Sequence, residues 1–441
     1  MRGTLTAYSL VALSALGCTA AKGEKGDPGA TGAPGPRGPA GEAGTLGPGW
    51  VNVRSAPYSA AGDGKTDDTA AFQQALNEIA TQGGGIVWAP TGNYLISTHL
   101  TIGAHTTLQG IFHAPAAYAQ NKGTTLLAVE GEGDPGGDAF ITLAGPNSTL
   151  EGVVIYYPNQ ALTNPPTQYP WTVRAGGGDD VAILDTLIVN GWQAVDFGTN
   201  PSNRHMIRGL YGQPAKTGIW VDQCHDIGRI RNVHFWPFFT HDKSYNEFQH
   251  GNAVAFLFQR TDWEVVEDVF SWGYQTGAQF SASKSGAMNG QITDANFDNV
   301  DVGLDLYATK PWAIHVSNLN IANAGAGSNR IGIWAHSGQT GVNLSVRNAS
   351  FWGSLEQAVR WESSGALSSS DARMDGWNGQ NPAIDIVGGR AMVHDNFFQD
   401  AIGIAIHVGP NTGRVMITGN ELAGNTLQLQ GPSTLSANNH P

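Results

Sequence analysis

Apolar and polar residues alternate along most of this chain in short segments that return at nearly constant intervals. One six-residue phrase occurs eleven times, for example as Ile183–Ile188, Val266–Ser271 and Val316–Ile321. Its first residue is apolar in every copy except the degraded one at Ser369, and its third residue is always Asn, Asp or Gly. Because these three residue types adopt a left-handed backbone at low cost, each copy predicts a short strand that bends at a fixed corner.

The spacing of these corners indicates a repeat architecture. Successive corners between positions 185 and 419 are 24, 23, 36, 26, 24, 30, 23, 24 and 24 residues apart. A period of this length, built from short strands, is typical of one coil of a parallel β-helix. A leucine-rich repeat would need a regular leucine ladder, and an antiparallel barrel would need turns at half the spacing. We therefore expect an all-β fold, a right-handed single-stranded parallel β-helix over residues 100–441, with about 11–12 coils.

A second strand follows about nine residues after each corner, and its alternation predicts two faces. The apolar positions expected to point inward are Val195, Ile219, Val254, Leu304, Ile333, Val359, Ile384 and Ile404. The outward positions are Asp196, Trp220, Asp222, Ala255, Gln279, Asp305, Tyr307, Trp334, His336, Arg360, Glu362, Asp385 and His407. Interleaved carboxylates and aromatic rings along one face indicate a groove for an extended, weakly charged glycan. A solvated polar face is the alternative, and the recurring Trp favours binding.

The segment before the coils, residues 50–99, is expected to form an N-terminal cap that contains an α-helix. Asp67 or Asp68 is the predicted N-cap, and Phe72, Leu76 and Ile79 form the apolar stripe. Strands are expected at 86–88 and 92–97, after a turn of three glycines.

This cap resembles the start of the pectate-lyase-superfamily β-helix proteins, which include rhamnogalacturonase-like enzymes, exo-glucanase-like enzymes and tailspike domains. The resemblance rests on Gly62–Thr69, Gly83–Gly85 and Pro90–Tyr94. The chain departs from the family at Tyr58–Ala60, where Phe-Gly-Ala is usual. The resemblance implies the β-helix fold and a helix that plugs the first coil. It also implies structural roles for three carboxylates, namely Asp63, Asp67 and Asp68.

The N-terminus predicts export. Residues 1–18 place Arg2 before an apolar run that is too short to span a membrane, as in a signal peptide. Cys18 follows Gly17 as in a lipoprotein cleavage box, so the protein is expected to be either lipid-anchored through Cys18 or freely secreted. No other membrane contact is expected.

Residues 19–49 have glycine at every third position from Gly23 to Gly47. Only glycine fits the axis of a collagen triple helix, so this tract is either a collagen-like stalk, which would make a homotrimer, or a disordered spacer.

Composition narrows the function. The net charge of −13, from 23 basic and 36 acidic residues, argues against nucleic acid as a partner. Only 13% of residues are charged while 59 are glycine, which suits a protein of sheets and turns. Two cysteines provide no disulfide framework, and Cys224 is expected to be an unreactive thiol.

Two carboxylates on adjacent coils are the candidate catalytic pair. Asp196 and Asp222 are offset by two residues along the strand, which places their attachment points about 8 Å apart. That separation suits an inverting glycoside hydrolase. The next candidates are Asp262, Glu264 and Asp305.

The candidate substrate-binding residues surround this pair. They are Trp220, Arg204, His205, His234, Trp236, Tyr307, Trp334 and His336. The polar insertion at 240–250 is expected to be a mobile loop that walls the groove. Its His and acidic residues have no tight metal-ligand spacing, so neither a metal nor another cofactor is expected.

We therefore expect an extracellular glycoside hydrolase that acts on a neutral polysaccharide. The alternative is a non-catalytic glycan-binding adhesin or tailspike-like protein, which would be trimeric if the tract at 19–49 forms a triple helix. A polysaccharide lyase is the second alternative, disfavoured because the outward row is acidic and aromatic rather than basic.

Overall fold

The computed structural model describes residues 49–113, 123–237, 241–323, 329–338, 341–399 and 403–441. Residues Leu46–Pro441 form one compact unit. The predicted export signal, Cys18 and the collagen-like tract lie outside the described residues. Neither helix in the described segments is long and apolar enough to cross a membrane.

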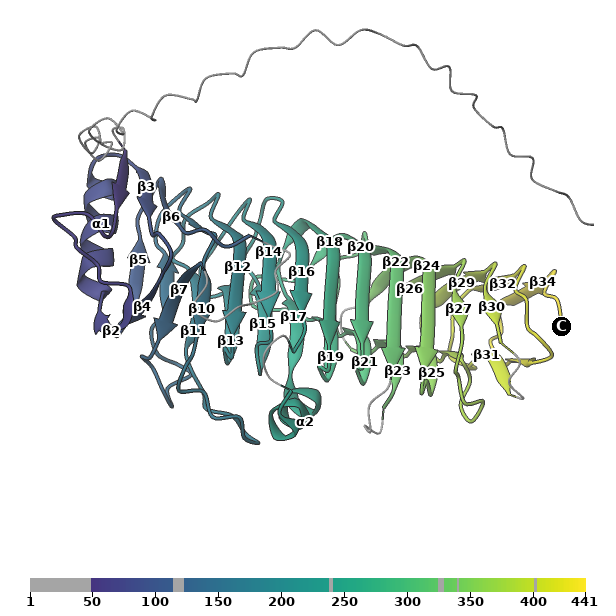
Figure 1. The fold of residues 1–441 in the computed structure, drawn as a ribbon. Helices are drawn as coiled ribbons and strands as arrows, with labels where there is room; N and C mark the ends of the chain where they lie inside the picture. The colour runs from purple at the N-terminus through teal and green to yellow at the C-terminus, as the bar shows by residue number, and fades with distance from the viewer. Residues whose placement is uncertain (1–48, 114–122, 238–240, 324–328, 339–340, 400–402) are drawn as a thin grey trace, which may run out of the picture. The chain divides into compact units, whose positions relative to one another are not determined.

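Two parallel sheets build the coils, which stack from the helix α1 end to the C-terminus (Figure 1). Sheet I has 21 strands: β1 (Trp50–Asn52), β2 (Asp63–Asp67), β3 (Gly85–Trp88), β4 (Gly92–Ile96), β6 (Thr106–Gln109), β7 (Thr124–Ala128), β9 (Thr149–Glu151), β10 (Val154–Tyr156), β12 (Ala182–Val189), β14 (Met206–Gly212), β16 (Arg229–Phe235), β18 (Asp262–Trp272), β20 (Asn289–Asp298), β22 (Ile314–Asn323), β24 (Asn343–Gly353), β26 (Ala366–Ser370), β27 (Arg373–Met374), β29 (Arg390–His394), β30 (Phe397–Phe398), β32 (Val415–Thr418) and β34 (Thr434–Ala437).

Sheet II has 13 strands, which pair in chain order: β5 (Leu100–Ile102), β8 (Ile141–Leu143), β11 (Trp171–Ala175), β13 (Gln193–Phe197), β15 (Thr217–Val221), β17 (Val254–Phe258), β19 (Thr276–Phe280), β21 (Val302–Leu306), β23 (Ile331–Ala335), β25 (Gln357–Trp361), β28 (Ile384–Ile386), β31 (Ile404–Val408) and β33 (Thr426–Leu429). Each coil contributes one strand to this sheet. The right-handed parallel β-helix is confirmed, with slightly more coils than the sequence predicted.

The repeated phrase forms the corner inside sheet I. Its third residue has a left-handed backbone in the successive coils, with φ of 43° at Asp185, 51° at Asn232, 54° at Asp294 and 55° at Asn318. The parallel ladder continues on both sides of the corner and skips the corner residue itself. The predicted bend is therefore confirmed.

Side chains at the corner also stack from coil to coil. The amide of Asn318 donates to Oδ1 of Asp294 at 2.8 Å, and the amide of Asn348 donates to Oδ1 of Asn318 at 2.7 Å. Asn and Asp at this position therefore permit the bend and also link neighbouring coils.

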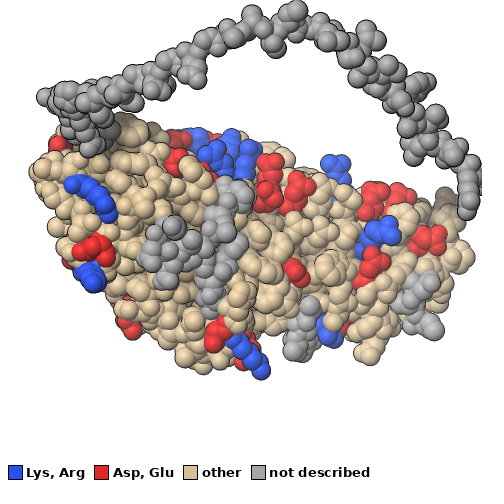
Figure 2. All heavy atoms as spheres, viewed as in Figure 1, with Lys and Arg blue, Asp and Glu red and all other residues tan. Residues whose placement is uncertain are grey.

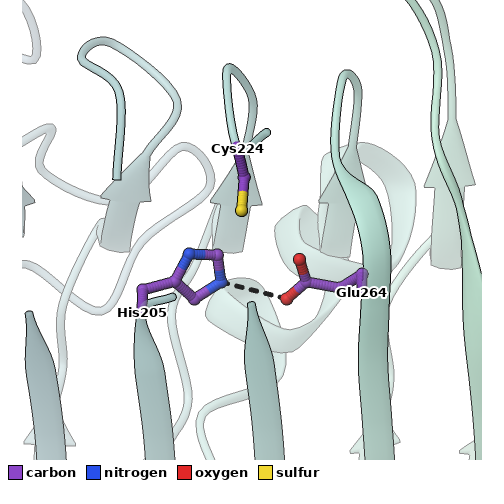
Figure 3. Close-up of side chains that lie close together, drawn as sticks. All are labelled: His205, Cys224 and Glu264. Atoms are coloured by element: carbon purple, nitrogen blue, oxygen red, sulfur yellow. Dashed lines mark hydrogen bonds and ion pairs between the residues drawn. The ribbon is translucent and has the colours of Figure 1, made fainter. Parts of the chain in front are cut away.

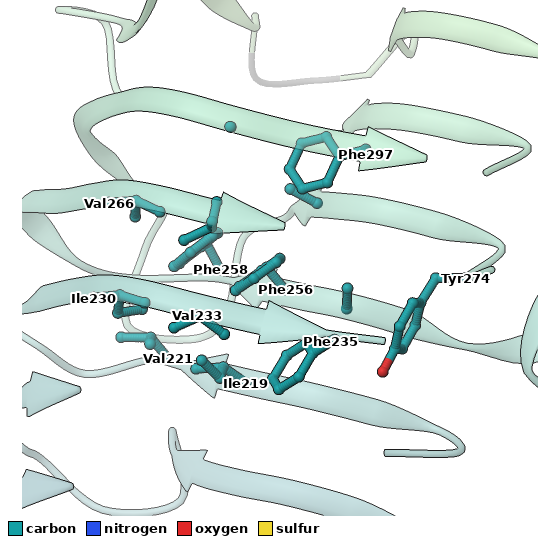
Figure 4. Packing of buried hydrophobic residues seen from close by; sticks show 14 of the residues in the cluster. Ile219, Val221, Ile230, Val233, Phe235, Phe256, Phe258, Val266, Tyr274 and Phe297 are labelled. Atoms are coloured by element: carbon teal, nitrogen blue, oxygen red, sulfur yellow. The ribbon is translucent and has the colours of Figure 1, made fainter. Parts of the chain in front are cut away.

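The interior is a continuous apolar core between the sheets, and Figure 4 shows Ile219, Phe235, Phe256 and Phe258 packed within it. The inward positions Val195, Ile219, Leu304, Ile333, Val359 and Ile384 are confirmed, because all have no exposed surface. The prediction was wrong at two coils. Phe256 and Ile406, rather than Val254 and Ile404, occupy the register position of this row. Correspondingly, Leu257 and not Ala255 faces outward.

The N-terminal helix α1 (Thr69–Thr81) begins after Asp68, as predicted, and buries Phe72, Leu76 and Ile79. The Asp68 carboxylate does not cap the helix. It accepts hydrogen bonds from the backbone of Ala61 at 2.6 Å and Gly62 at 2.9 Å, which ties the preceding turn to the helix.

The insertion after β16 was predicted to be a mobile loop, but it contains a helix. Helix α2 (Lys243–Asn252) is capped by Asp242, which accepts a hydrogen bond from the backbone of Tyr245 at 3.1 Å. Tyr245 and Phe248 are buried against the coils. The insertion is thus anchored by its apolar residues, which the polar composition of the segment obscured.

A substitution at the corner tests this description. Asn318→Val places a β-branched residue in the left-handed region, at a cost of about 1–2 kcal/mol, and removes the two amide links. We expect a lower thermal unfolding midpoint than in Asn318→Gly, which loses the links but keeps the bend. Equal midpoints for the two variants would contradict a conformational role for the corner.

Candidate functional site

One outward row on sheet II presents one side chain per coil. The register aligns Trp220, Leu257, Gln279, Asp305, Trp334, Arg360, Asp385 and His407. We call this row, with the residues that flank it at the strand ends, the sheet II face. Parallel pairing spaces its members about 4.8 Å apart, so the face is a regular linear array.

A stack of rings lies at the centre of this face. The Tyr307 and His336 rings are parallel, with centroids 4.1 Å apart, and the Trp334 ring stacks on His336 at 4.3 Å. The Arg360 guanidinium covers Trp334 at 4.9 Å from its centroid. Because Tyr307 is 42% exposed, part of this platform is available to a ligand.

Polar groups hold the stack in place. His336 Nε2 lies 2.6 Å from Asp305 Oδ1, and the Gln279 amide donates to Asp305 Oδ2 at 3.2 Å. Burial and the neighbouring Asp305 carboxylate both raise the pKa of Tyr307 above its usual value. Its hydroxyl therefore stays protonated at neutral pH and is a hydrogen-bond donor.

A second aromatic platform lies farther along the same face. Trp171 stacks on Trp220 at 6.0 Å, and the Trp220 indole donates to Gln259 Oε1 at 3.0 Å. Only Leu257, Gln279 and Asp305 separate Trp220 from Trp334 along the row. The two platforms are thus about 19 Å apart, at four coils of 4.8 Å each.

Ionisable side chains on the face are in hydrogen-bond contact with one another. Arg360 Nε donates to Glu362 Oε1 at 2.7 Å, and His407 Nδ1 lies 2.6 Å from Asp385 Oδ1. Together with the Asp305–His336 contact, these pairs account for every charged member of the described row between Gln279 and His407. The row therefore offers hydrogen-bonding groups without a net attraction for a polyanion.

The predicted catalytic carboxylate Asp196 is fully buried. Its Oδ1 accepts from the backbone of Gly198 at 3.0 Å and Thr199 at 2.8 Å. Its Oδ2 accepts from the Thr199 hydroxyl and from Arg174 Nε, both at 2.7 Å. These four bonds use the lone pairs that a catalytic acid or base would need, so Asp196 orders the turn after β13.

Asp222 is in a similar position on the next coil. It is 4% exposed, and its Oδ1 accepts from the backbone of Gln223 at 2.8 Å, the backbone of Arg260 at 2.9 Å and the hydroxyl of Ser283 at 2.9 Å. Asp196 and Asp222 lie on adjacent coils with an offset of two residues, as predicted, because Asp196 pairs with Trp220. The carboxylates nevertheless serve the turns and not an open groove.

The other acidic candidates, Asp262, Glu264 and Asp305, lie in three different environments. Asp262 forms a two-pronged ion pair with Arg260, at 2.8 and 2.7 Å, and a further ion pair with Lys310. Glu264 has no exposed surface, whereas Asp305 belongs to the sheet II face. Of these, only Asp305 lies beside the aromatic stack.

The predicted binding residues divide between four locations. Trp220, Tyr307, Trp334 and His336 lie on the sheet II face. Arg204 lies in an exposed turn, where it forms ion pairs with a group of acids, Asp179, Asp180 and Asp226.

The remaining predicted residues are not part of the face. His205 is completely buried. His234 and Trp236 lie beside the aromatic rings of sheet I, with centroids 4.6 Å from Phe270 and 5.4 Å from Trp272, respectively. Burial lowers the pKa of His234, so it is neutral at pH 7.

His205 belongs to a buried polar cluster with Cys224 and Glu264 (Figure 3). His205 Nε2 lies 3.0 Å from Glu264 Oε1, and its Nδ1 lies 2.8 Å from the Ser202 carbonyl. Burial lowers the pKa of His205, whereas the Glu264 charge and the contact with Cys224 raise it. The second effect is larger, so the net pKa of His205 is well above its usual value. The pair is therefore an imidazolium and a carboxylate.

The same three residues are the candidate metal ligands among the described residues. Their ligand atoms lie within 4.8 Å of one another, and these are ligand types that zinc accepts. However, the imidazole and carboxylate satisfy each other directly, and the Cys224 thiol donates to the Asp226 carbonyl at 3.3 Å. We interpret the cluster as a buried polar network.

Gly228 shows how tightly this network is enclosed. A Cβ at this position would lie 2.3 Å from His205 Nε2 and 2.4 Å from Glu264 Oε2. Only glycine therefore lets the chain pass over the ion pair.

The sequence reading missed the contribution of Trp171, which lies one coil before the row that was considered and packs on Trp220. The period of the outward row gave no signal for it, because Arg174 and not Trp171 pairs with Asp196. The mutual pairing of Asp385 with His407 was also invisible in the sequence, because the two residues come from different coils.

Comparison with known proteins agrees with the fold. Residues 50–173 match one family model. Its description is rhamnogalacturonase A/epimerase, pectate lyase-like. The match covers the N-terminal cap and the first coils. No curated protein sequence matches the chain.

Solved structures with the same architecture cover most of the chain at low identity. The mannuronan C-5 epimerase AlgE6 A-module of Azotobacter vinelandii is 14% identical over 88% of this chain and 99% of its own, with a TM-score of 0.52. The pre-mature gene product 12 of bacteriophage phi29 is 15% identical over 84% of this chain and 52% of its own, with a TM-score of 0.57. PfbA, a surface adhesin of Streptococcus pneumoniae, is 14% identical over 87% and 93%, with a TM-score of 0.50. These similarities establish a shared fold.

The buried ion pair makes stability depend on pH. Below the unfolded-state His pKa of about 6.5, both states carry the proton and the pair contributes fully. As the pH rises further, the folded protein keeps a proton that the unfolded chain loses, so the free energy of unfolding falls until the pH passes the folded pKa. Glu264→Gln should flatten this dependence above about pH 6.5 and cost about 3–5 kcal/mol at pH 6.

The double variant His205→Gln/Glu264→Gln is the matched control. It restores a neutral hydrogen-bonded pair, so it should be more stable than Glu264→Gln alone. Parallel stability profiles for the wild type and Glu264→Gln across this pH range would contradict the ion pair.

Proposed function

We propose that this protein binds an extended neutral glycan along the sheet II face. The observation that carries the proposal is the partly exposed stack of Tyr307, His336 and Trp334, in which Asp305 contacts His336. Aromatic faces hold the apolar faces of sugars, and flanking amides and carboxylates bind hydroxyl groups. Recognition is thus favoured over the glycoside hydrolase that the sequence suggested, because Asp196 and Asp222 are engaged in turns.

The length of the face supports an oligosaccharide rather than a single sugar. The Trp171–Trp220 platform lies about 19 Å from Trp334, and the row between them is regular. A ligand that contacts both platforms would be an extended chain. The same periodicity that builds the coils would then repeat the contacts along the ligand.

In this proposal the protein acts outside the cytoplasm. Residues 1–18 direct export, with either a lipid on Cys18 or free secretion, and the glycine-periodic tract at 19–49 is a stalk or spacer that carries the β-helix. A triple-helical stalk would join three chains and multiply the glycan contacts by avidity. Surface adhesins are found among proteins with this fold, as are enzymes, so the fold alone leaves both roles open.

Hydrolysis is the second candidate, on one observation. Glu362 and Asp385 are on adjacent coils, since Asp385 pairs with Arg360, two residues before Glu362. Their attachment points are about 8 Å apart, which suits an inverting mechanism. Both side chains are about one-fifth exposed, at 21% and 20%. A polysaccharide lyase is less well supported, because the face has no unpaired cation to neutralise a uronate.

Trp334→Ala tests the binding proposal. The loss of the largest ring of the stack should weaken binding of neutral hexasaccharides by about tenfold, or about 1.4 kcal/mol, as measured by calorimetry against a glycan panel. Trp352→Ala is the matched control, because Trp352 is 49% exposed on sheet I, away from this face. Equal affinities for the two variants would rule out the sheet II face as the binding site.

Glu362→Gln and Asp385→Asn test hydrolysis. If the pair is catalytic, each should lower turnover of the bound glycan by about 10²–10⁴-fold while binding is retained. Unchanged turnover in both variants would exclude these residues as the acid and base. A wild-type protein that binds a glycan and never cleaves it would exclude the hydrolase and leave the recognition function.

A further inference from the structure

A groove of about 550 Å³ lies on the outer face of sheet I, separate from the sheet II face. It crosses strands β24, β26, β29 and β32, on the segment that precedes the corner of each coil, and is bordered by residues 311–313 just before β22. Two outward rows form its floor. The first contains Ser345, Ser368, Met392 and Met416 in register. The second contains Asn343, Ala366 and Arg390 in register, with Arg414 on the next coil.

Small side chains create the hollow. Ser345, Ala366 and Ser368 occupy the middle of the floor, so the backbone is covered only thinly there. Trp312 rises at one end and is 60% exposed, and Arg390 and Met392 rise at the other. The distance between these ends is about 14 Å, because three coil spacings separate the Trp312 loop from Arg390.

Ionic contacts and hydrogen bonds hold the loop that carries Trp312 in position. Lys310 forms an ion pair with Asp262, and its ammonium lies 5.9 Å from the centroid of the Trp312 ring. The Lys310 backbone donates to the Met288 carbonyl at 2.9 Å, and the Thr309 hydroxyl accepts from the backbone of Asn343 at 2.8 Å. The loop therefore presents the indole as a fixed platform before any ligand binds.

The opposite end of the groove is positively charged. Arg390 and Arg414 precede the paired residues Ala391 and Val415, so they stand at equivalent positions on adjacent coils. Like charges placed side by side on neighbouring strands repel each other. Neither guanidinium has a carboxylate within ion-pair distance among the described residues, and both are exposed. This contrasts with the sheet II face, where charged members of the row are paired.

We propose that this groove is a second glycan-binding site, specific for an oligosaccharide that carries an anionic group. The Trp312 ring would stack on a sugar, the Ser345 and Ser368 hydroxyls would bind its hydroxyl groups, and the two guanidiniums would bind a carboxylate or sulfate on the chain. Arginine pairs favour such anions because their forked donors match two oxygens at once. The net charge of −13 on the whole chain makes this local cationic pair distinctive. The site does not depend on the function proposed for the sheet II face.

The two proposed sites differ in the charge of the glycan that they recognise. In Figure 2 the middle of the visible face is largely uncharged, and the Lys, Arg, Asp and Glu side chains lie mostly towards its edges. In this proposal a neutral glycan and an acidic glycan are recognised on different faces, and one protein molecule is able to hold both.

The test uses calorimetry with three oligosaccharides of equal length: an oligogalacturonate, a sulfated carrageenan oligomer and a neutral cello-oligomer. We expect one or both acidic ligands to bind and the neutral ligand not to enter the groove. Arg390→Gln/Arg414→Gln should weaken acidic-ligand binding by at least tenfold, and Trp312→Ala should weaken it similarly. Arg373→Gln is the matched control, because it removes an exposed arginine of the same sheet that is paired with Asp375.

The outcomes separate the possibilities. Binding of the oligogalacturonate alone identifies a carboxylate ligand, and binding of the carrageenan oligomer alone identifies a sulfate ligand. Failure of both acidic ligands to bind at millimolar concentration overturns the proposal, as does equal binding by Arg390→Gln/Arg414→Gln and Arg373→Gln. Neutral-glycan binding at the sheet II face should be unchanged by the arginine substitutions, so the failure of one site is distinguishable from the failure of the other.

Discussion

The structure depends on the registered stacking of one coil on the next. Parallel pairing links the described strands of neighbouring coils and closes an apolar interior in which Ile219, Phe256, Ala278 and Leu304 follow one another in register. This stacking requires each coil to turn at the same place, which the left-handed residues at Asp294, Asn318 and their equivalents provide. A change in one coil is therefore felt by both neighbours, and the period of the sequence is a direct record of this constraint.

The same constraint decides what the surface can do. Each face of the solenoid presents one side chain every 4.8 Å or so, and a function arises when several adjacent coils supply compatible groups. On sheet II the coils supply stacked rings with internally paired charges. On sheet I they supply a hollow of small residues between an indole and two unpaired arginines. In this account one face of the scaffold suits a neutral ligand and the other an anionic one, although the whole chain is acidic.

The fold could be predicted from the sequence because it depends on local conformational preferences that recur. The corner at Asp185 and the inward position of Val195 needed only the residue type and the period. The register beyond an insertion could not be obtained in this way, so Val254 was assigned to the place of Phe256. The candidate site was harder still. Asp196 looks available in the sequence, but its burial results from hydrogen bonds with Arg174 on the coil before and with its own turn. His205 and Glu264 are 59 residues apart and pair only because their coils stack on either side of the coil that carries Gly228.

The central claim is that the sheet II face holds an extended neutral glycan across its two aromatic platforms. A crystal structure of the protein with the tightest-binding neutral hexasaccharide tests this most directly. The account predicts sugar rings packed on Trp334 and Tyr307, with the chain running across successive coils towards Trp220. An oligosaccharide bound elsewhere, for example over Trp236 and Trp272 on sheet I, with the Tyr307–His336–Trp334 stack unoccupied, would contradict it.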